Sequence, residues 1–151
     1  MTRTVKLSGF KELDQVLGQL NKVTAKATAR KALMEAAEPM ARLARANAPK
    51  DSLDLSESID VSTKLTKRQR SLHRRQFRNS AAFSEVFVGP DGDPAAWNQE
   101  FGNINHPAQP YLRPAFDQDA RAFIDRLKLE LIDQLDRAIA RARAKAAQQA
   151  A

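Results

Sequence analysis

The sequence contains no cysteine, one tryptophan, one tyrosine and two histidines among its 151 residues. Without cysteine the chain can form neither a disulfide framework nor a thiolate nucleophile, and this composition fits a reducing compartment. No run approaches the 20 or so apolar residues of a membrane span, and the first residues lack the apolar segment of a signal peptide. We therefore expect a protein that is made in the cytoplasm and has no membrane partner.

Motifs of catalysis and ligand binding are also missing. There is no G-x-S-x-G turn, no glycine-rich phosphate loop and no H-E-x-x-H helix. His73 and His106 have no metal-binding partner at ligand spacing, so they are expected to be ordinary surface or turn residues. Asp91 opens a stretch like a calcium loop, but Gly102 stands where the bidentate glutamate is needed. The sequence therefore predicts a protein that is not an enzyme and uses no cofactor or metal.

Positive charge is concentrated in one stretch of the chain. The net charge is +7 at pH 7, and no aspartate or glutamate occurs between Asp60 and Glu85. The seven cations of this stretch are Lys64, Lys67, Arg68, Arg70, Arg74, Arg75 and Arg78. The other 18 of the 25 basic residues balance the 18 acidic ones, so the basicity is local. The segment is predicted either to contact an anion such as the DNA backbone, without sequence readout, or to remain a solvated loop or meet an acidic protein; the two readings carry equal weight.

Alternating hydrophobicity predicts two strands. Apolar and polar residues alternate over residues 58–65, and β-branched and aromatic residues are enriched over 81–89. The strands should pair antiparallel as a hairpin within residues 55–90. Their connection, residues 64–79, is longer than a tight turn needs, so it should project as a basic arm, either a loop or a short helical excursion.

Helical spacing predicts N-terminal helices within residues 9–48, one over 9–21 and one over 24–47. Pro39 lies inside the second, where it should cause a kink near residues 35–38 or a break into two helices. A loop region over residues 91–113 should contain one helical turn at 95–101.

The clearest pattern is a long C-terminal helix over residues 114–147. At 1.5 Å per residue it would span roughly 50 Å, more than the width of a globule of this size, so its end should contact another subunit or extend freely. The predicted fold class is α+β in a single domain, residues 1–151: a small antiparallel β-sheet with an extended basic hairpin arm, flanked by N-terminal helices and the long C-terminal helix.

Aromatic residues and prolines gather in residues 97–102 and 107–116. This composition is enriched at protein contacts, and the alternative is a satellite core beneath the long helix. A mixture is expected, with Tyr111, Leu112 and Phe116 inward and Trp97 near a boundary. The candidate subunit-interface residues are Trp97, Glu100, Phe101 and Arg113.

Five short motifs occur in a recognisable order. They are Ala46-Asn47-Ala48-Pro49, Leu55-Ser56-Glu57-Ser58-Ile59, Val86-Phe87-Val88-Gly89, Glu100-Phe101-Gly102 and the block from Pro107 to Phe116. This arrangement resembles the gene-product-ten-like family of head-to-tail joining and tail-completion proteins of lambdoid long-tailed phages, over residues 9 to about 130. The proline-rich block is the most specific part. One departure is Ser52-Leu53, where family members usually carry a Thr-Gly pair.

The resemblance implies a non-catalytic virion protein of the phage neck, made in the bacterial host cytoplasm. It implies a homo-oligomeric ring, six-fold to match a tail tube, between the head connector and the tail tube. The partners would be other copies of the chain, the neighbouring connector protein, and a tail-terminator or tail-tube protein. The local positive charge of the basic arm, and not the resemblance, adds the hypothesis that the arm contacts genomic DNA in the channel. Such a ring needs two different contact surfaces, for which the long helix and residues 97–101 are the candidates.

Two other functions remain open from the sequence. A tail-terminator ring protein would have a similar size and fold class and would bind the tail-tube protein directly. Outside the phage setting, a basic module that binds DNA without sequence specificity would use the arm as its active part, and it would bind tightly as a monomer or dimer.

Overall fold

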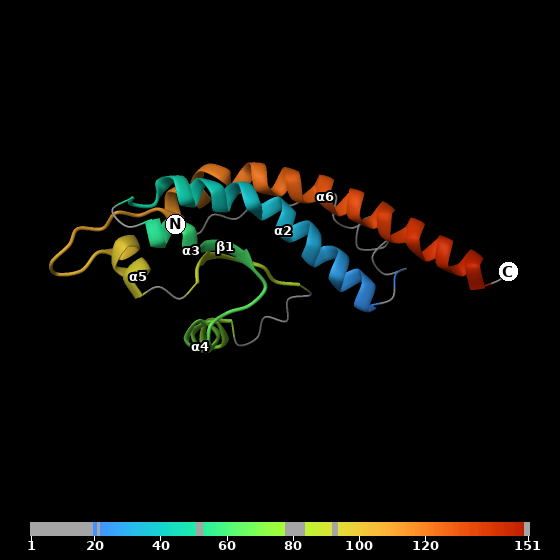
Figure 1. The fold of residues 1–151 in the computed structure, drawn as a ribbon, viewed down its shortest axis with the longest axis horizontal. Coiled ribbons are helices and arrows are strands. Elements are labelled where there is room, and N and C mark those ends of the chain that lie inside the picture. The colour runs from blue at the N-terminus through green and yellow to red at the C-terminus, as the bar shows by residue number, and fades with distance from the viewer. Residues whose placement is uncertain (1–19, 21, 51–52, 78–83, 92–93, 150–151) are drawn as a thin grey trace.

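Two long antiparallel helices form the spine of the molecule (Figure 1). The computed structural model describes residues 20, 22–50, 53–77, 84–91 and 94–149, so the helix predicted over 9–21 lies, apart from residue 20, outside the described residues. The spine consists of α2 (Lys22–Asn47) and α6 (Leu112–Gln149), and a sheet of β1 (Ile59–Ser62) and β2 (Phe87–Pro90) lies against it. The described residues also form three shorter helices: α3 (Leu53–Ser58), α4 (Lys67–Gln76) and α5 (Pro94–Phe101). The architecture is α+β, as predicted.

Helix α2 packs through alanines on two of its faces. Ala29 and Ala32 form a buried cluster with Leu131 of α6, whereas Ala37 and Ala41 pack against Val61 of the sheet. Because alanine has only a methyl group, the helix can approach both neighbours closely without any loss of helix propensity. The alanine-rich composition thus places α2 between α6 and the sheet.

Pro39 lies within α2 without ending it. The helix is continuous from Lys22 to Asn47, so the alternative of a break into two helices is wrong. Proline lacks the N–H that would bond to the carbonyl four residues earlier, which disturbs this part of the helix. Arg126 of α6 donates from Nε and Nη2 to the adjacent carbonyl oxygen of Ala36, at 3.2 and 3.1 Å. A side chain of α6 therefore bonds to the helix carbonyl that follows the one left without an N–H donor by the proline.

The two strands are antiparallel, as predicted, but shorter than the sequence pattern indicated. Ile59 pairs with Pro90 and Ser62 with Phe87 at the two ends of the register. The expected strand at 58–65 ends at Ser62, whose Oγ accepts a hydrogen bond from the backbone N–H of Lys64 at 3.0 Å and so turns the chain. Of the expected strand at 81–89, residues 81–83 lie outside the described part of the chain, and the observed strand begins only at Phe87.

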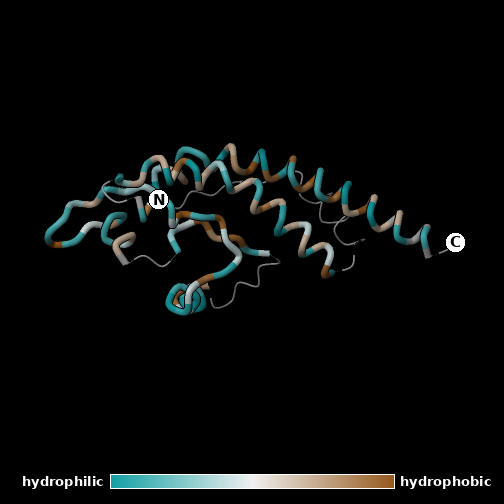
Figure 2. Tube along the Cα trace, in the orientation of Figure 1, coloured by the Kyte–Doolittle hydropathy of each residue, from teal (hydrophilic) through white to brown (hydrophobic). Residues whose placement is uncertain are grey.

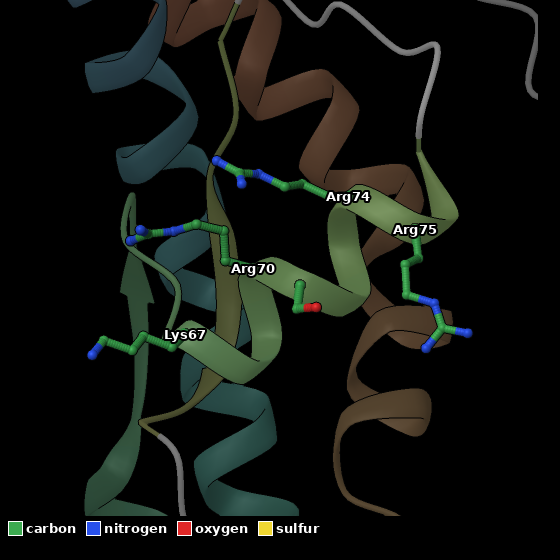
Figure 3. Close-up of a pocket in the computed structure, with 5 residues that line it drawn as sticks. Lys67, Arg70, Arg74 and Arg75 are labelled. Atoms are coloured by element: carbon green, nitrogen blue, oxygen red, sulfur yellow. The ribbon is translucent and has the colours of Figure 1, made fainter.

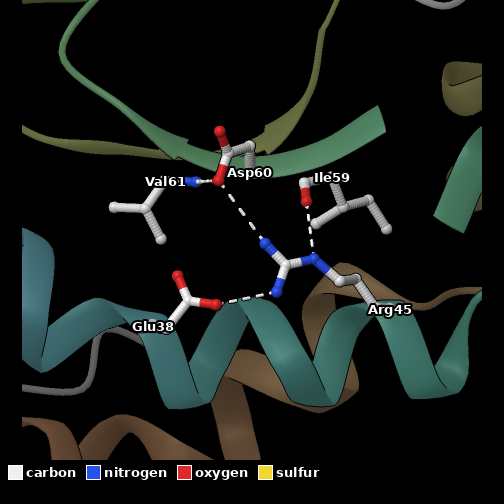
Figure 4. Close-up of polar contacts among 5 residues, drawn as sticks. All are labelled: Glu38, Arg45, Ile59, Asp60 and Val61. Atoms are coloured by element: carbon white, nitrogen blue, oxygen red, sulfur yellow. Dashed lines mark hydrogen bonds and ion pairs between the residues drawn. The ribbon is translucent and has the colours of Figure 1, made fainter. Parts of the chain in front are cut away.

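Arg45 joins α2 to the outer edge of β1 (Figure 4). Its Nε donates to the carbonyl oxygen of Ile59 at 2.8 Å, and its Nη1 donates to Glu38 at 2.8 Å. The Asp60 carboxylate accepts from the N–H of Val61 at 2.8 Å. These side chains occupy backbone groups that would otherwise present an open strand edge, so this edge is protected from unwanted pairing.

Helix α6 is 38 residues long and spans about 57 Å. It starts two residues earlier than expected, which places Pro114 in its first turn, where a missing N–H costs no helical hydrogen bond. Its C-terminal end extends past the start of α2 (Figure 1), and hydrophobic and hydrophilic residues alternate along it (Figure 2). No helix among the described residues is both long and apolar enough to cross a membrane.

Candidate nucleic-acid and subunit interfaces

The basic arm folds as a helix, the second of the two forms expected for it. Helix α4 begins with a reciprocal capping box, in which the backbone N–H of Gln69 donates to Thr66 Oγ1 at 3.3 Å and the N–H of Thr66 donates to Gln69 Oε1 at 2.9 Å. Basic residues fill its last turn, where they complement the negative end of the helix dipole. Five of the seven cations of the arm are therefore held on a regular helix.

One face of α4 packs on the sheet, on the side away from the spine. His73 lies 4.9 Å from the ring of Phe77 and 5.4 Å from that of Phe87, measured between ring centroids. The Nε2 atom of His73 is 3.8 Å from the carboxylate of Glu85. Gln69 reaches the carbonyl oxygen of Pro90 at 3.5 Å. His73 thus fixes which side of the helix faces inward.

The other faces of α4 carry the arm's cations (Figure 3). Lys67, Arg70 and Arg74 point to one side of the helix, and Arg75 points away from them. With Ser71, these four line a shallow hollow of about 340 Å³. Within the described residues none of the four pairs with a carboxylate, and the guanidinium of Arg70 donates only to the carbonyl oxygen of Leu65, at 3.3 Å. Such a face can accept anions at low desolvation cost.

The remaining predicted cations are distributed differently. Arg68 is exposed on α4 but does not line the hollow, and Lys64 is exposed just before the helix. Arg78 lies outside the described residues. The structure therefore brings together four of the seven residues predicted from the sequence.

Glu100 organises the second predicted site. Its buried carboxylate accepts hydrogen bonds from the backbone N–H groups of Tyr111, Leu112 and Arg113 at 2.8, 2.9 and 3.1 Å. Arg113 also donates through Nε to this carboxylate at 2.8 Å, and through Nη2 to the Glu100 carbonyl oxygen at 2.6 Å. Glu100 thereby caps the start of α6 from a distance in sequence.

These contacts also set the charge of Glu100. Burial would by itself raise the pKa of the carboxyl group, but the hydrogen bonds from Leu112, Tyr111 and Arg113 outweigh burial and lower the pKa below its usual value of 4.5. The carboxylate is therefore ionised at neutral pH and pairs with Arg113. The sequence predicts both residues at a subunit interface, and in the structure they hold α5 against α6.

The aromatic residues beside this pair are exposed. Trp97 and Phe101 lie one turn apart on α5 with ring centroids 4.3 Å apart, and the Arg113 guanidinium lies 4.9 Å from the Phe101 ring centroid. Tyr111 is buried and Leu112 partly buried, as expected, but the inward placement expected for Phe116 is wrong, because its residue surface is 58% exposed.

A tight loop projects beyond these aromatics (Figure 1). The N–H groups of Asn105 and His106 donate to the Asn103 side chain at 2.8 and 2.9 Å, and this turn leaves Ile104 99% exposed. Gly102 begins the loop with φ of +74°, and a Cβ atom there would lie 2.8 Å from the backbone nitrogen of Ala108. Only glycine fits this position without strain.

An apolar hollow of about 560 Å³ lies between α2, the β2 region and the first turns of α6, and sequence analysis missed it. Its apolar lining includes Leu33, Met40, Val86, Val88, Phe116 and Phe123. These residues come from three separate segments, so no single periodicity marks them. Among the described residues, no cluster of three or more acidic or histidine side chains could hold a metal ion.

Residues 11–102 match the bacteriophage HK97-gp10-like family of tail components. The chain belongs to this family. The match includes α2, the sheet, α4 and α5, whereas Arg113 and α6 lie beyond it, as does the proline-rich block from 107 to 116. Neither a curated protein nor a solved structure matches the chain. Membership in a family of phage tail components implies a place in the virion and partners among other phage tail and neck proteins.

Proposed function

We propose that this chain is a structural subunit of the phage neck, forming a ring that joins the head connector to the tail tube. Its membership in the tail-component family carries this proposal. The surface is consistent with such a role, since Trp97, Phe101 and Ile104 are exposed and belong to α5 and the loop after it, which lie at one end of the molecule (Figure 1). Exposed aromatic and aliphatic groups of this kind are typical of protein contacts.

We further propose that the basic face of α4 lies toward the DNA in the neck channel. Three observations support it: the cations share a helix, they pair with no carboxylate in the described part of the chain, and α4 lies on the side of the sheet opposite the spine. DNA that moves through a channel needs contacts without sequence readout, which Lys and Arg supply through phosphates. The basic face would neutralise backbone charge without fixing a register.

The DNA contact is tested by the salt dependence of binding. If the three aligned cations meet phosphates, the log-log slope of affinity against salt is about −3 per subunit, and about −6 if all seven cations do. Replacing Lys67, Arg70 and Arg74 with glutamine should make the slope less negative by about 3. A matched variant with glutamine at the exposed Arg121, Arg141 and Lys145 of α6 changes the net charge equally and should leave the slope unchanged. A wild-type slope near zero, or equal losses in both variants, would refute the contact.

The joining role is tested in the phage that encodes the chain. If the gene is deleted, filled heads and tails of normal length should accumulate unjoined, and supplying the chain in trans should restore intact particles. A tail terminator stops tube polymerisation, so its loss would instead give tails of uncontrolled length. Overlong tails would therefore favour the terminator function, and fully infectious particles would exclude both.

The basic face of α4 also favours a second candidate, a free-standing module that binds DNA without sequence specificity. This function predicts tight DNA binding by a monomer or dimer and no copies of the chain in the particle. Particle composition therefore separates the two functions.

A further inference from the structure

The apolar hollow between α2, the β2 region and α6 has no occupant among the described residues. Phe116 lines it and is 58% exposed, and Leu33 on α2 is only partly buried. An open hollow leaves its lining side chains in contact with water and without the dispersion contacts of a packed core. A surface of this kind fits a convex apolar partner.

A convex apolar stripe is present on α6 of the same chain. Leu129 is 69% exposed and Ile132 is 49% exposed, although both lie in the middle of a long helix. Asp125 and Asp136 extend this stripe by one turn at each end. At about 100° per residue the four side chains lie within about 60° of one another, over roughly 16 Å of helix.

The stripe and the hollow lie on opposite sides of α6. Phe116 and Phe123, which line the hollow, differ in helical angle by only about 20°, and the stripe lies about 160° around the helix from them. One subunit cannot bring these two surfaces together by itself. Successive subunits can, and contact between two different surfaces is what a head-to-tail ring requires.

One positive charge near the hollow, that of Arg30, can meet the negative charges of the stripe. Asp125 and Asp136 have no ion-pair partner among the described residues, with Lys128 to one side of them. The lining of the hollow contains Arg113, whose charge is paired with Glu100, and the carboxylate of Asp117. Arg30, one turn before Leu33 on α2, has no ion pair in the part of the chain described. Opposite charges at such a rim fix the register of a contact.

We propose that the α6 stripe of one subunit inserts into the hollow of the next, with Leu129 and Ile132 against Leu33 and Phe116. This contact rests on the proposed ring and names its two faces. Each subunit then offers one convex and one concave surface. Head-to-tail contacts of this kind form a closed ring when the rotation between neighbouring subunits divides a full turn evenly.

The absence of cysteine allows a direct cross-linking test. A chain carrying Leu33→Cys and Ile132→Cys should form a ladder of covalent multimers after oxidation, or with a bismaleimide where disulfide geometry is not met. Each single-cysteine chain alone should stay uncross-linked, and a mixture of the two should stop at heterodimers. Met34→Cys is the matched control for Leu33→Cys, because it lies about 100° around α2. The yield of cross-linked multimers from Met34→Cys with Ile132→Cys should be at least about tenfold lower than from Leu33→Cys with Ile132→Cys.

Charge reversal gives a second, independent measurement. Asp125→Lys with Asp136→Lys should abolish the ladder, and adding Arg30→Glu should restore part of it, an outcome that a merely misfolded variant cannot produce. Homodimers of the Ile132→Cys chain alone would overturn the proposal, because they require a symmetric contact. The assay is run on the concentrated protein and on assembled particles. A ring in particles without cross-linking would overturn this contact and leave the proposed function standing, whereas particles without any ring would overturn both.

Discussion

Replacing Glu100 with alanine is expected to lower the free energy of unfolding by about 3–5 kcal/mol. The substitution removes the acceptor of three backbone N–H groups at the start of α6 and leaves Arg113 without its carboxylate. For a domain of this size the loss corresponds to a fall of roughly 10 °C in Tm. Thermal and denaturant melts of the two chains measure it.

Glu100→Gln is the matched variant, because it keeps an oxygen acceptor but loses the charge. It should lower the free energy of unfolding by less than Glu100→Ala does, because the amide oxygen still accepts hydrogen bonds from the backbone N–H groups. The charge-assisted bond from Arg113 is lost in both variants. A loss below about 1 kcal/mol for the alanine variant would contradict the capping role.

The contribution of Glu100 should depend on pH. Its pKa is lower in the folded chain than the usual 4.5, so its stabilising effect is fully present above that value and is lost as pH falls through the lower pKa of the folded protein. The stability difference between the wild type and Glu100→Gln should therefore shrink as pH falls below about 4.5. Melts from neutral to acidic pH would reveal it, and a difference that grows on acidification would have the wrong sign.

The second large effect is expected for Arg126→Met. Asp119 is buried and pairs with Arg126, which donates from Nη1 at 3.0 Å, and the same guanidinium bonds to the carbonyl oxygen of Ala36 near Pro39. Removing the arginine leaves a buried carboxylate without a counter-ion and a helix carbonyl without its side-chain donor. The expected cost is about 3–5 kcal/mol, because an uncompensated buried charge is more harmful than the pair is favourable.

A double-mutant cycle distinguishes this explanation from a simple loss of packing. Adding Asp119→Leu to Arg126→Met should recover much of the stability, because the unpaired charge is then gone. The measured quantity is the free energy of unfolding of the four chains. Strict additivity of the two single losses would contradict a coupled pair.

The long helices could be predicted from the sequence because their apolar residues repeat over many turns. Residues 24–47 and 114–147 were each placed within a few residues of α2 and α6. The helix of the basic arm was one of two expected forms, and the T-x-x-Q capping signal of Thr66 and Gln69 could have decided between them. Sequence patterns therefore suffice to predict elements, such as long helices and capped helix starts, whose structure is set by residues close together in the chain.

Short elements were harder to predict. Leu53–Ser58 is helix α3, whereas the sequence pattern predicts no helix there and includes residues 55–58 in the hairpin segment. In six residues helical and alternating periods are nearly indistinguishable, and the tertiary contacts of Leu55 in the core decide between them. The lengths of both strands were overestimated for a related reason. The alternation of apolar and polar residues continues beyond the few residues that pair with the other strand.

The roles of the site residues depend on contacts that no local pattern contains. Glu100 was placed at an interface by composition, but the N–H groups it binds lie 11 to 13 residues away. Phe116 fits the apolar period of α6 and was expected inward, yet it borders an open hollow. In both cases the packing of α5 and the sheet against the spine determines the role.

Cryo-electron microscopy of particles from the encoding phage tests the central proposal most directly. We expect a ring of this chain between the head connector and the tail tube, with the α6 stripe of each subunit in the hollow of the next and Lys67, Arg70 and Arg74 facing the channel. Absence of the chain from the neck would contradict the proposed function and make the DNA-binding module the leading function.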